Sequence, residues 1–196
     1  VSCHYYITGS GKVIQMVPDL YVAWHAGMSS WGNYISLNKY SIGIEISNPG
    51  HEYGYRKFNY NQIQSLIKIS KKIIKKYKIR KKNILGHSDI APDRKKDPGE
   101  KFPWRFLSKK KIGYWHNINQ SVLSKSRYLA IDKYEQKKFL KNIYKIGYPK
   151  NNIVKKTRYL KILSKAFQRR FRQELVNGII DKECLKISEN LLKKII

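Results

Sequence analysis

Two residues with metal-ligand side chains, His87 and Asp97, lie ten positions apart in the segment GHSDIAPDRKKDPG. Imidazole and carboxylate groups are normal ligands of zinc, and a catalytic zinc usually has three protein ligands and one open position. The pair by itself is therefore one ligand short. A histidine at the end of an apolar strand is more often a hydrogen-bonded structural residue than a ligand, so the residues alone leave both interpretations open.

A further charged candidate, Glu45, lies in the alternating segment Ser41–Ser47. Ile42, Ile44 and Ile46 share one face of the expected strand, and Glu45 points to the other face. A carboxylate is costly to bury without a partner or a role, so this position favours a functional residue. The alternative is an ordinary charge on the solvated face of an edge strand.

The elements that must position these residues follow an α/β pattern. A Gly-Ser-Gly-Lys turn predicts a hairpin, apolar residues at three-four spacing predict one long helix, and a stretch rich in turn residues predicts an ordered loop. The expected elements are a hairpin from Cys3–Thr8 to Val13–Val17, strands Ser41–Ser47 and Asn83–His87, a helix from about Asn59 to Lys78 and a loop over Ala91–Trp104. This order predicts a mixed central sheet flanked by helices.

The chain changes character after about residue 118. Residues 119–132 are polar at their start and lack periodicity, which predicts a linker. Residues 133–196 contain three apolar stripes at helical spacing, which predict a small three-helix domain. The expected division is therefore a catalytic domain over 1–118, a linker over 119–132 and a helical domain over 133–196.

Composition excludes some classes of protein and leaves others open. The net charge is +28, but lysines are spread through both halves without an RNP, zinc-finger or helix-turn-helix pattern, so no nucleic-acid partner is expected. No apolar run reaches the length of a membrane span. Cys3 and Cys184 form no metal motif, and two unrelated small buried residues are favoured over a disulfide. Val1–Ile7 has the pattern of a strand already under way, so the natural chain is expected to begin earlier.

Six motifs occur in order along residues 1–115: VSCHYYI, VAWHAG, SIGIEISNPG, GHSDIAPDRKKDPG, FPW and IGYW. Together they resemble the AmpD/AmiD-like N-acetylmuramoyl-L-alanine amidases of the amidase-2 group, and the AmiD-like branch most of all. That group is also similar to a phage lysozyme and to the peptidoglycan recognition proteins. The resemblance implies an amidase-2 fold and hydrolysis of the bond between N-acetylmuramic acid, or its 1,6-anhydro form, and L-alanine.

The same resemblance assigns roles to individual residues. It implies that His87 and Asp97 are two of the three ligands of one Zn²⁺, and that the third is a histidine on a strand ahead of residue 1. His4 matches a family histidine that is not a ligand, although it is the one candidate for a substitute. Glu45 matches the catalytic glutamate. Lys95 matches the lysine that stabilises the oxyanion. Its neighbours Arg94 and Lys96 are the other candidates for this position.

The remaining expectations concern substrate and setting. His25 and Asn38 match motifs near the substrate groove, whereas Trp104 and Trp115 are expected to be packing residues. The helical domain resembles, more loosely, a peptidoglycan-binding domain, and its alternative is a bundle that only packs on the catalytic domain. We expect a monomer acting on peptidoglycan or muropeptides in the periplasm, or as a secreted or outer-membrane-associated protein, with the cytoplasm as another setting. The alternative function is a catalytically silent peptidoglycan binder.

Overall fold

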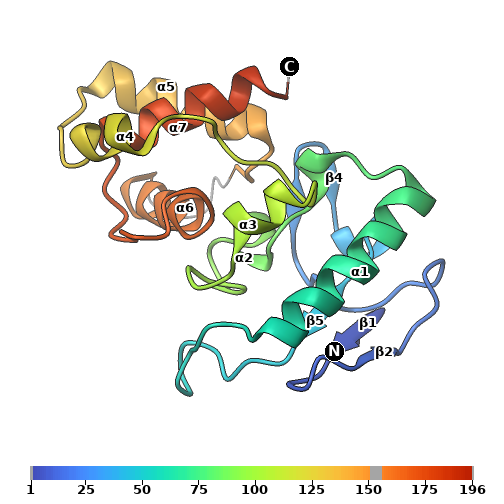
Figure 1. The fold of residues 1–196 in the computed structure, drawn as a ribbon. Helices are drawn as coiled ribbons and strands as arrows, with labels where there is room; N and C mark the ends of the chain where they lie inside the picture. The colour runs from blue at the N-terminus through green and yellow to red at the C-terminus, as the bar shows by residue number, and fades with distance from the viewer. Residues whose placement is uncertain (1, 151–155, 196) are drawn as a thin grey trace.

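The computed structural model describes residues 2–150 and 156–195. Its strands are β1 (Tyr5–Ile7), β2 (Val13–Gln15), β3 (Ser30–Trp31), β4 (Tyr34–Ile35) and β5 (Ile44–Ile46). Strand β1 lies at the centre of a three-stranded sheet, antiparallel to β2 and parallel to β5. Strands β3 and β4 form a separate two-stranded ribbon (Figure 1).

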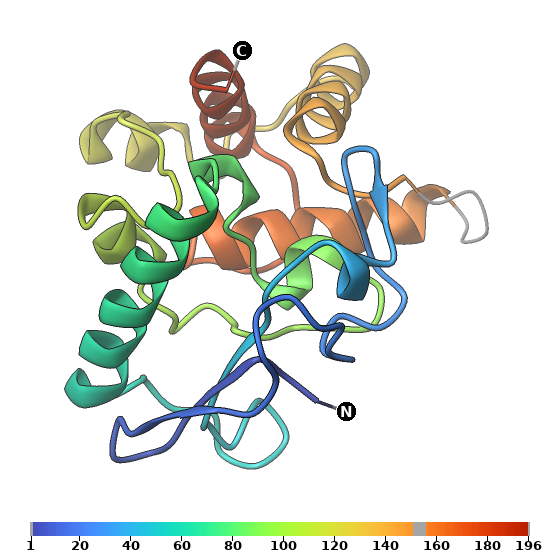
Figure 2. The ribbon, with the colours of Figure 1, turned by 90° about the vertical axis from the view of Figure 1, so that its right-hand side faces the viewer.

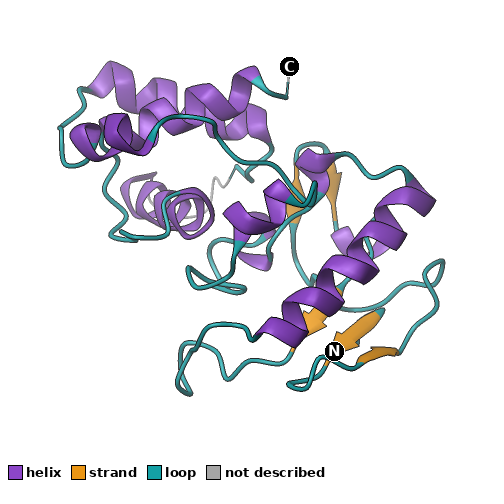
Figure 3. Cartoon of the chain, viewed as in Figure 1, coloured by secondary structure: helices purple, strands orange, loops and turns teal. Residues whose placement is uncertain are grey.

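Helices make up most of the remaining regular structure (Figure 3). They are α1 (Tyr60–Tyr77), α2 (His87–Ile90), α3 (Trp104–Lys109), α4 (Gln120–Ser126), α5 (Lys133–Ile146), α6 (Lys156–Phe171) and α7 (Lys182–Lys193), with short 3-10 turns η1 (Leu37–Lys39) and η2 (Lys81–Asn83). The mixed sheet with flanking helices confirms the predicted fold class. The hairpin of β1 and β2 and the three C-terminal helices α5, α6 and α7 were also predicted, and both are present.

The long helix α1 has the ends and the apolar face that the sequence predicts. The Asn59 side chain accepts a hydrogen bond from the Gln62 N–H in a capping box, and Lys78 ends the helix in the left-handed conformation with a φ of 51°. The buried face packs Ile63 and Leu66 against Ile7 of the sheet. Each such side chain contributes roughly 1.5–3 kcal/mol of apolar burial, so this contact holds the sheet against α1.

The predicted strand over Asn83–His87 is wrong for the described structure. Ile84 and Gly86 have extended backbone angles, but neither pairs with a described strand. Side chains bond to their backbone groups instead: Arg170 donates to the Ile84 carbonyl at 2.7 Å, and the Gly86 N–H donates to Asp89 at 2.7 Å. His87 consequently starts a short helix rather than ending a strand.

The C-terminal helices share a hydrophobic core with the first part of the chain. Helix α5 packs against α7, whereas α6 contacts α2 and α3, as Figure 2 shows from the side. One continuous cluster joins Ala26, Trp31 and Leu37 to Phe139 and Phe167. The segment 119–132, predicted as a linker, contains α4, which contacts α7. It is therefore a packed part of the fold.

The structure also bears on the two cysteines and on membrane-spanning segments. Cys3 and Cys184 are both buried and both free, so the preference for two unrelated small buried residues is confirmed. Among the described residues, no helix is long and apolar enough to cross a membrane.

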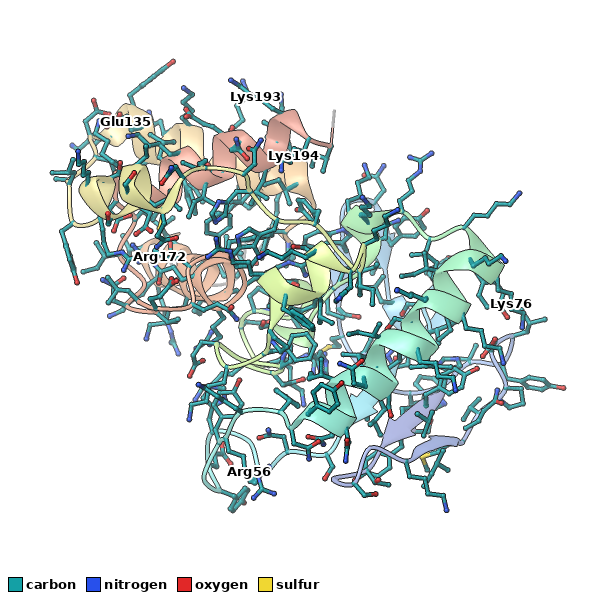
Figure 4. All side chains as sticks on the ribbon, in the orientation of Figure 1. Arg56, Lys76, Glu135, Arg172, Lys193 and Lys194 are labelled. Atoms are coloured by element: carbon teal, nitrogen blue, oxygen red, sulfur yellow. The ribbon has the colours of Figure 1, made fainter. Side chains whose placement is uncertain are left out.

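A polar cluster at Asp19 ties the segment after β2 to the end of α1. Tyr5 and Tyr77 donate hydrogen bonds to its carboxylate at 2.5 and 2.8 Å, and Lys76 lies 3.0 Å away (labelled in Figure 4). Burial alone would raise the pKa of Asp19, but these three donors outweigh it and lower the pKa to about 2. Burial raises the pKa of Tyr5 to about 12, and the Asp19 carboxylate adds to the rise.

Replacing Asp19 with Asn should therefore destabilise the protein in a pH-dependent way. The folded pKa of about 2 lies below the ordinary 3.8, so the carboxylate contributes about 2 kcal/mol above about pH 4, and this is lost as the pH falls toward 2. Urea unfolding of Asp19→Asn and the parent should differ by this amount at neutral pH and converge in acid. The exposed Asp93→Asn is the control; an unchanged difference in acid would contradict the assignment.

Candidate metal and catalytic site

One cavity of about 530 Å³ collects the side chains that the sequence singles out as catalytic or metal-binding. Its lining includes Glu45 from β5, His87 from the first position of α2, and Lys95 and Asp97 from the loop that follows α2. These residues come from two segments more than thirty-five positions apart in the chain. The fold therefore brings together four groups with complementary chemistry: the Glu45 carboxylate, the Lys95 ammonium group, and an imidazole and a carboxylate of the types that bind metals.

The two expected ligands face each other directly. Nδ1 of His87 lies 3.1 Å from Oδ2 of Asp97, and the Ser88 N–H donates to the Asp97 backbone carbonyl at 2.8 Å, which ties the two segments together. Ligands about 2.0–2.1 Å from a tetrahedral zinc lie about 3.3 Å from each other. The donor pair therefore has a spacing that fits a shared zinc ion.

A complete ligand set is not present in the described part of the chain, which contains no group of three or more His, Cys, Asp or Glu side chains suited to a metal. His4 does not supply the missing ligand. Its Nδ1 accepts from the Gly43 N–H at 3.0 Å and its Nε2 donates to the Tyr21 carbonyl at 2.9 Å, and the ring is almost wholly buried. Both nitrogens are committed to the backbone, so His4 positions the strands.

The protonation of the two carboxylates differs within this cavity. Desolvation raises the pKa of Glu45, and the Asp97 carboxylate adds to the rise, while His87 and Lys95 oppose it. Desolvation also acts to raise the pKa of Asp97, but the hydrogen bond and charge of His87 outweigh it and hold this pKa below its ordinary value. A carboxylate with a raised pKa suits a proton acceptor and donor, and one with a lowered pKa suits a ligand.

The two basic residues before Asp97 have separate positions. Lys95 is half-buried and lines the cavity with Glu45. Arg94, which also borders the cavity, donates to the carbonyls of Ala26 and Met28. The Ala26 carbonyl also lies 3.1 Å from Nε2 of His87. Arg94 therefore holds the backbone of the segment beside His87, a role that the sequence did not indicate.

His25 and Asn38 differ in their relation to the cavity. His25 lines it, and burial lowers the pKa of its imidazole to about 4, so it is neutral at pH 7. Its ring packs on Gly43, where an added Cβ would lie 2.3 Å from the ring. Asn38 is buried outside the lining, and its side chain accepts a hydrogen bond from the Ala26 N–H at 2.7 Å. The structure therefore places His25, but not Asn38, in the lining shared by Glu45, His87, Lys95 and Asp97.

A buried ion pair behind the cavity is the feature that sequence reasoning missed. Arg170 of α6 pairs with Asp89 of α2, two residues after His87, and both side chains are almost inaccessible to solvent. Asp89 also accepts a hydrogen bond from the Tyr148 hydroxyl at 2.7 Å. The guanidinium carbon of Arg170 lies 4.2 Å from the centroid of the Trp104 ring, which is buried as a packing residue. The only signal in the sequence was the cluster of arginines in AFQRRFR.

Comparison with known proteins gives this arrangement a family. The amidase-2 family model, described as N-acetylmuramoyl-L-alanine amidase, matches residues 1–100. The N-acetylmuramoyl-L-alanine amidase AmiD of Escherichia coli is 35% identical over 209 residues, which cover 99% of this chain and 74% of that protein. The chain belongs to the N-acetylmuramoyl-L-alanine amidase family.

Further amidases of this family show how far the similarity extends. The 1,6-anhydro-N-acetylmuramyl-L-alanine amidase AmpD of Escherichia coli is 39% identical over 53% of this chain and 55% of that protein. The structure of Escherichia coli AmiD, in complex with anhydro-N-acetylmuramic acid-L-Ala-D-gamma-Glu-L-Lys, superposes with a TM-score of 0.87 at 33% identity, covering 98% of this chain and 79% of that one. The AmiD match therefore includes the C-terminal helices as well as the amidase-2 region.

The buried pair predicts a large effect for a residue far from the cavity. Removing one partner of a buried ion pair costs about 3–5 kcal/mol because the other charge stays buried and uncompensated. Arg170→Met should therefore lower the free energy of unfolding by that amount in urea titrations. Arg56→Met, at an exposed arginine labelled in Figure 4, should change it by less than about 0.5 kcal/mol. Equal effects of the two substitutions would refute a structural role for the pair.

Proposed function

We propose that this protein uses one zinc ion to hydrolyse the amide bond between N-acetylmuramic acid, or its 1,6-anhydro form, and L-alanine in peptidoglycan or muropeptides. The observation that carries the proposal is the convergence of Glu45, His87, Lys95 and Asp97 on one cavity. Membership of the amidase family supports the type of bond. A cavity of about 530 Å³ is within the size range of small-ligand sites.

Each residue has a role that its position supports. His87 and Asp97 would hold the zinc, which supplies polarisation of the scissile carbonyl and a water of lowered pKa when it is bound. Glu45 would take the proton from the attacking water and deliver it to the leaving amine, a role that a raised carboxylate pKa suits. The Lys95 ammonium would stabilise the negative charge that develops on the carbonyl oxygen.

The rim of the cavity offers a surface for the sugar part of the substrate. Trp24 lines the cavity and is 67% exposed, so its indole is accessible to a ligand there. An indole face can pack against the apolar face of a sugar while its N–H bonds to a hydroxyl or water. We assign Trp24 to substrate binding together with His25, whose ring lies beside the catalytic groups.

The second candidate function, a silent peptidoglycan binder, would retain the cavity and lack turnover. The presence of Glu45 and Lys95 beside the ligand pair favours an enzyme. We also propose a periplasmic, secreted or outer-membrane-associated location, which the resemblance to the AmiD-like branch implies, with the cytoplasm as the alternative.

Replacement of the proposed base should separate chemistry from metal binding. Glu45→Gln should lower kcat on anhydro-muropeptides by about 100-fold or more, since general bases contribute about 100- to 10,000-fold, with the zinc content unchanged. Release of the free stem peptide is measured by mass spectrometry. Glu52→Gln, at an exposed glutamate, is the matched control and should leave kcat unchanged. A fully active Glu45→Gln would remove this residue from the base role.

Removal of the metal tests the cofactor. Treatment with EDTA should abolish turnover, and Zn²⁺, but not Mg²⁺, should restore it, because an N/O site of this kind favours zinc. His87→Ala and Asp97→Ala should each lower the zinc content of the purified protein, whereas His51→Ala, at a histidine outside the ligand pair, should not. Full turnover by metal-free protein would disprove the zinc mechanism.

A further inference from the structure

A second cavity, of about 890 Å³, lies on the opposite face of α3 from the catalytic cavity. Trp104 and Leu107 of α3 line the catalytic cavity, whereas Arg105, Ser108 and Lys109 line the second one. Its other walls are η2 with the residue before it, the segment 113–118 and the end of α7. Figure 4 labels Lys194, the residue that caps α7.

The lining is more basic than the chain as a whole. Six of its fourteen residues are Lys or Arg, against 41 of 196 in the sequence, and none is Asp or Glu. The six are Arg80, Lys81, Lys82, Arg105, Lys109 and Lys194. None of them forms an ion pair with a carboxylate that the structure describes. Cations that converge on a hollow without counter-charges create a field that concentrates anions.

The interior of the cavity also carries polar and aromatic groups suited to a ligand. His116 also lines the cavity, but its Nδ1 is inaccessible to solvent and has no hydrogen-bond partner among the described residues, so this nitrogen is not presented to a ligand. Burial lowers the pKa of His116 to about 4, and the nearby Arg105 and Lys194 contribute, so the ring is neutral at pH 7. Trp115 is half-buried in the wall, where its ring also packs on His116 and Phe171. Asn117 is a further polar lining residue.

These features favour one class of ligand over two others. A membrane surface would require a projecting apolar face, whereas this site is hollow and basic. Single-stranded nucleic acid is usually held by a series of aromatic side chains that stack with bases, and here one indole is half-buried in the wall. A ligand with several phosphates on a hydroxyl-rich backbone would use the cations, the indole face and the amide together.

We propose that this second cavity is a binding site for a phosphorylated glycan or polyol, separate from the amidase centre. Such a ligand would place its phosphates against Arg105, Lys82 and Lys194 and its sugar or polyol part against Trp115. The site would hold the enzyme on an anionic polymer while the catalytic cavity on the other face of α3 stays open.

Binding of a short glycerol phosphate oligomer, measured by calorimetry at low salt, tests this site without any turnover. The variant Lys82→Gln/Arg105→Gln/Lys194→Gln should bind about tenfold or more weakly than the parent, because each exposed ion pair adds a modest increment. The control Lys137→Gln/Lys141→Gln/Lys145→Gln removes three charges from exposed positions of α5 and should change affinity by less than about twofold. Thermal melting checks that both variants fold. If the Lys82→Gln/Arg105→Gln/Lys194→Gln variant does not fold, the single variant Arg105→Gln replaces it.

Further arms decide between sources of phosphate. Equal weakening by both triple variants would show general charge attraction and overturn the proposal. The proposal would also be overturned if the parent bound oligothymidylate or phosphatidylglycerol–phosphatidylcholine vesicles more tightly than the glycerol phosphate oligomer, and if only the Lys82→Gln/Arg105→Gln/Lys194→Gln variant lost that binding. Inorganic phosphate that matches the affinity of the oligomer would overturn the glycan or polyol assignment. Weakening of oligomer binding by Trp115→Leu, with inorganic phosphate unaffected, would support it. Because no arm measures amidase activity, failure here leaves the proposed function untouched.

Discussion

The buried ion pair between Asp89 and Arg170 is the interaction on which the geometry of the candidate site depends. Asp89 lies two residues after His87, in a helix of only four residues that has little stability of its own. Its carboxylate accepts hydrogen bonds from the Gly86 N–H, the Tyr148 hydroxyl and Arg170, so its charge is compensated by three donors. A buried charge must be paired in this way, and the pairing fixes the segment that presents His87.

The same pair makes the C-terminal helices part of the site's support. Arg170 comes from α6, and Gly147, after α5, packs so closely on Trp31 that a Cβ there would lie 2.5 Å from the indole. Trp31 and Ala26 belong to the same core cluster as the C-terminal helices. Whether these helices also bind wall polymer stays a prediction; their packing already gives them a structural role, and α3 separates the two cavities.

The candidate site combines groups whose environments set different protonation preferences. Glu45 has a raised pKa because desolvation and Asp97 oppose its charge, and Asp97 has a lowered one because His87 supports its charge. The two carboxylates share one cavity, yet they suit separate roles. Arg94 and Asn38 act behind them by holding the backbone of Ala26, whose carbonyl lies beside His87.

The sequence alone determined the α/β class, the long helix α1 and the three C-terminal helices, because apolar periodicity is a local property of the chain. Motif order singled out five of the residues that line the catalytic cavity, namely His25, Glu45, His87, Lys95 and Asp97. The sequence did not determine the conformation of residues 83–87, where extended angles are present but side chains, not a strand, bond to the backbone. It also missed the Asp89–Arg170 pair and the burial of Asn38 outside the cavity. Those contacts join residues eighty-one and twelve positions apart, so only tertiary packing decided them.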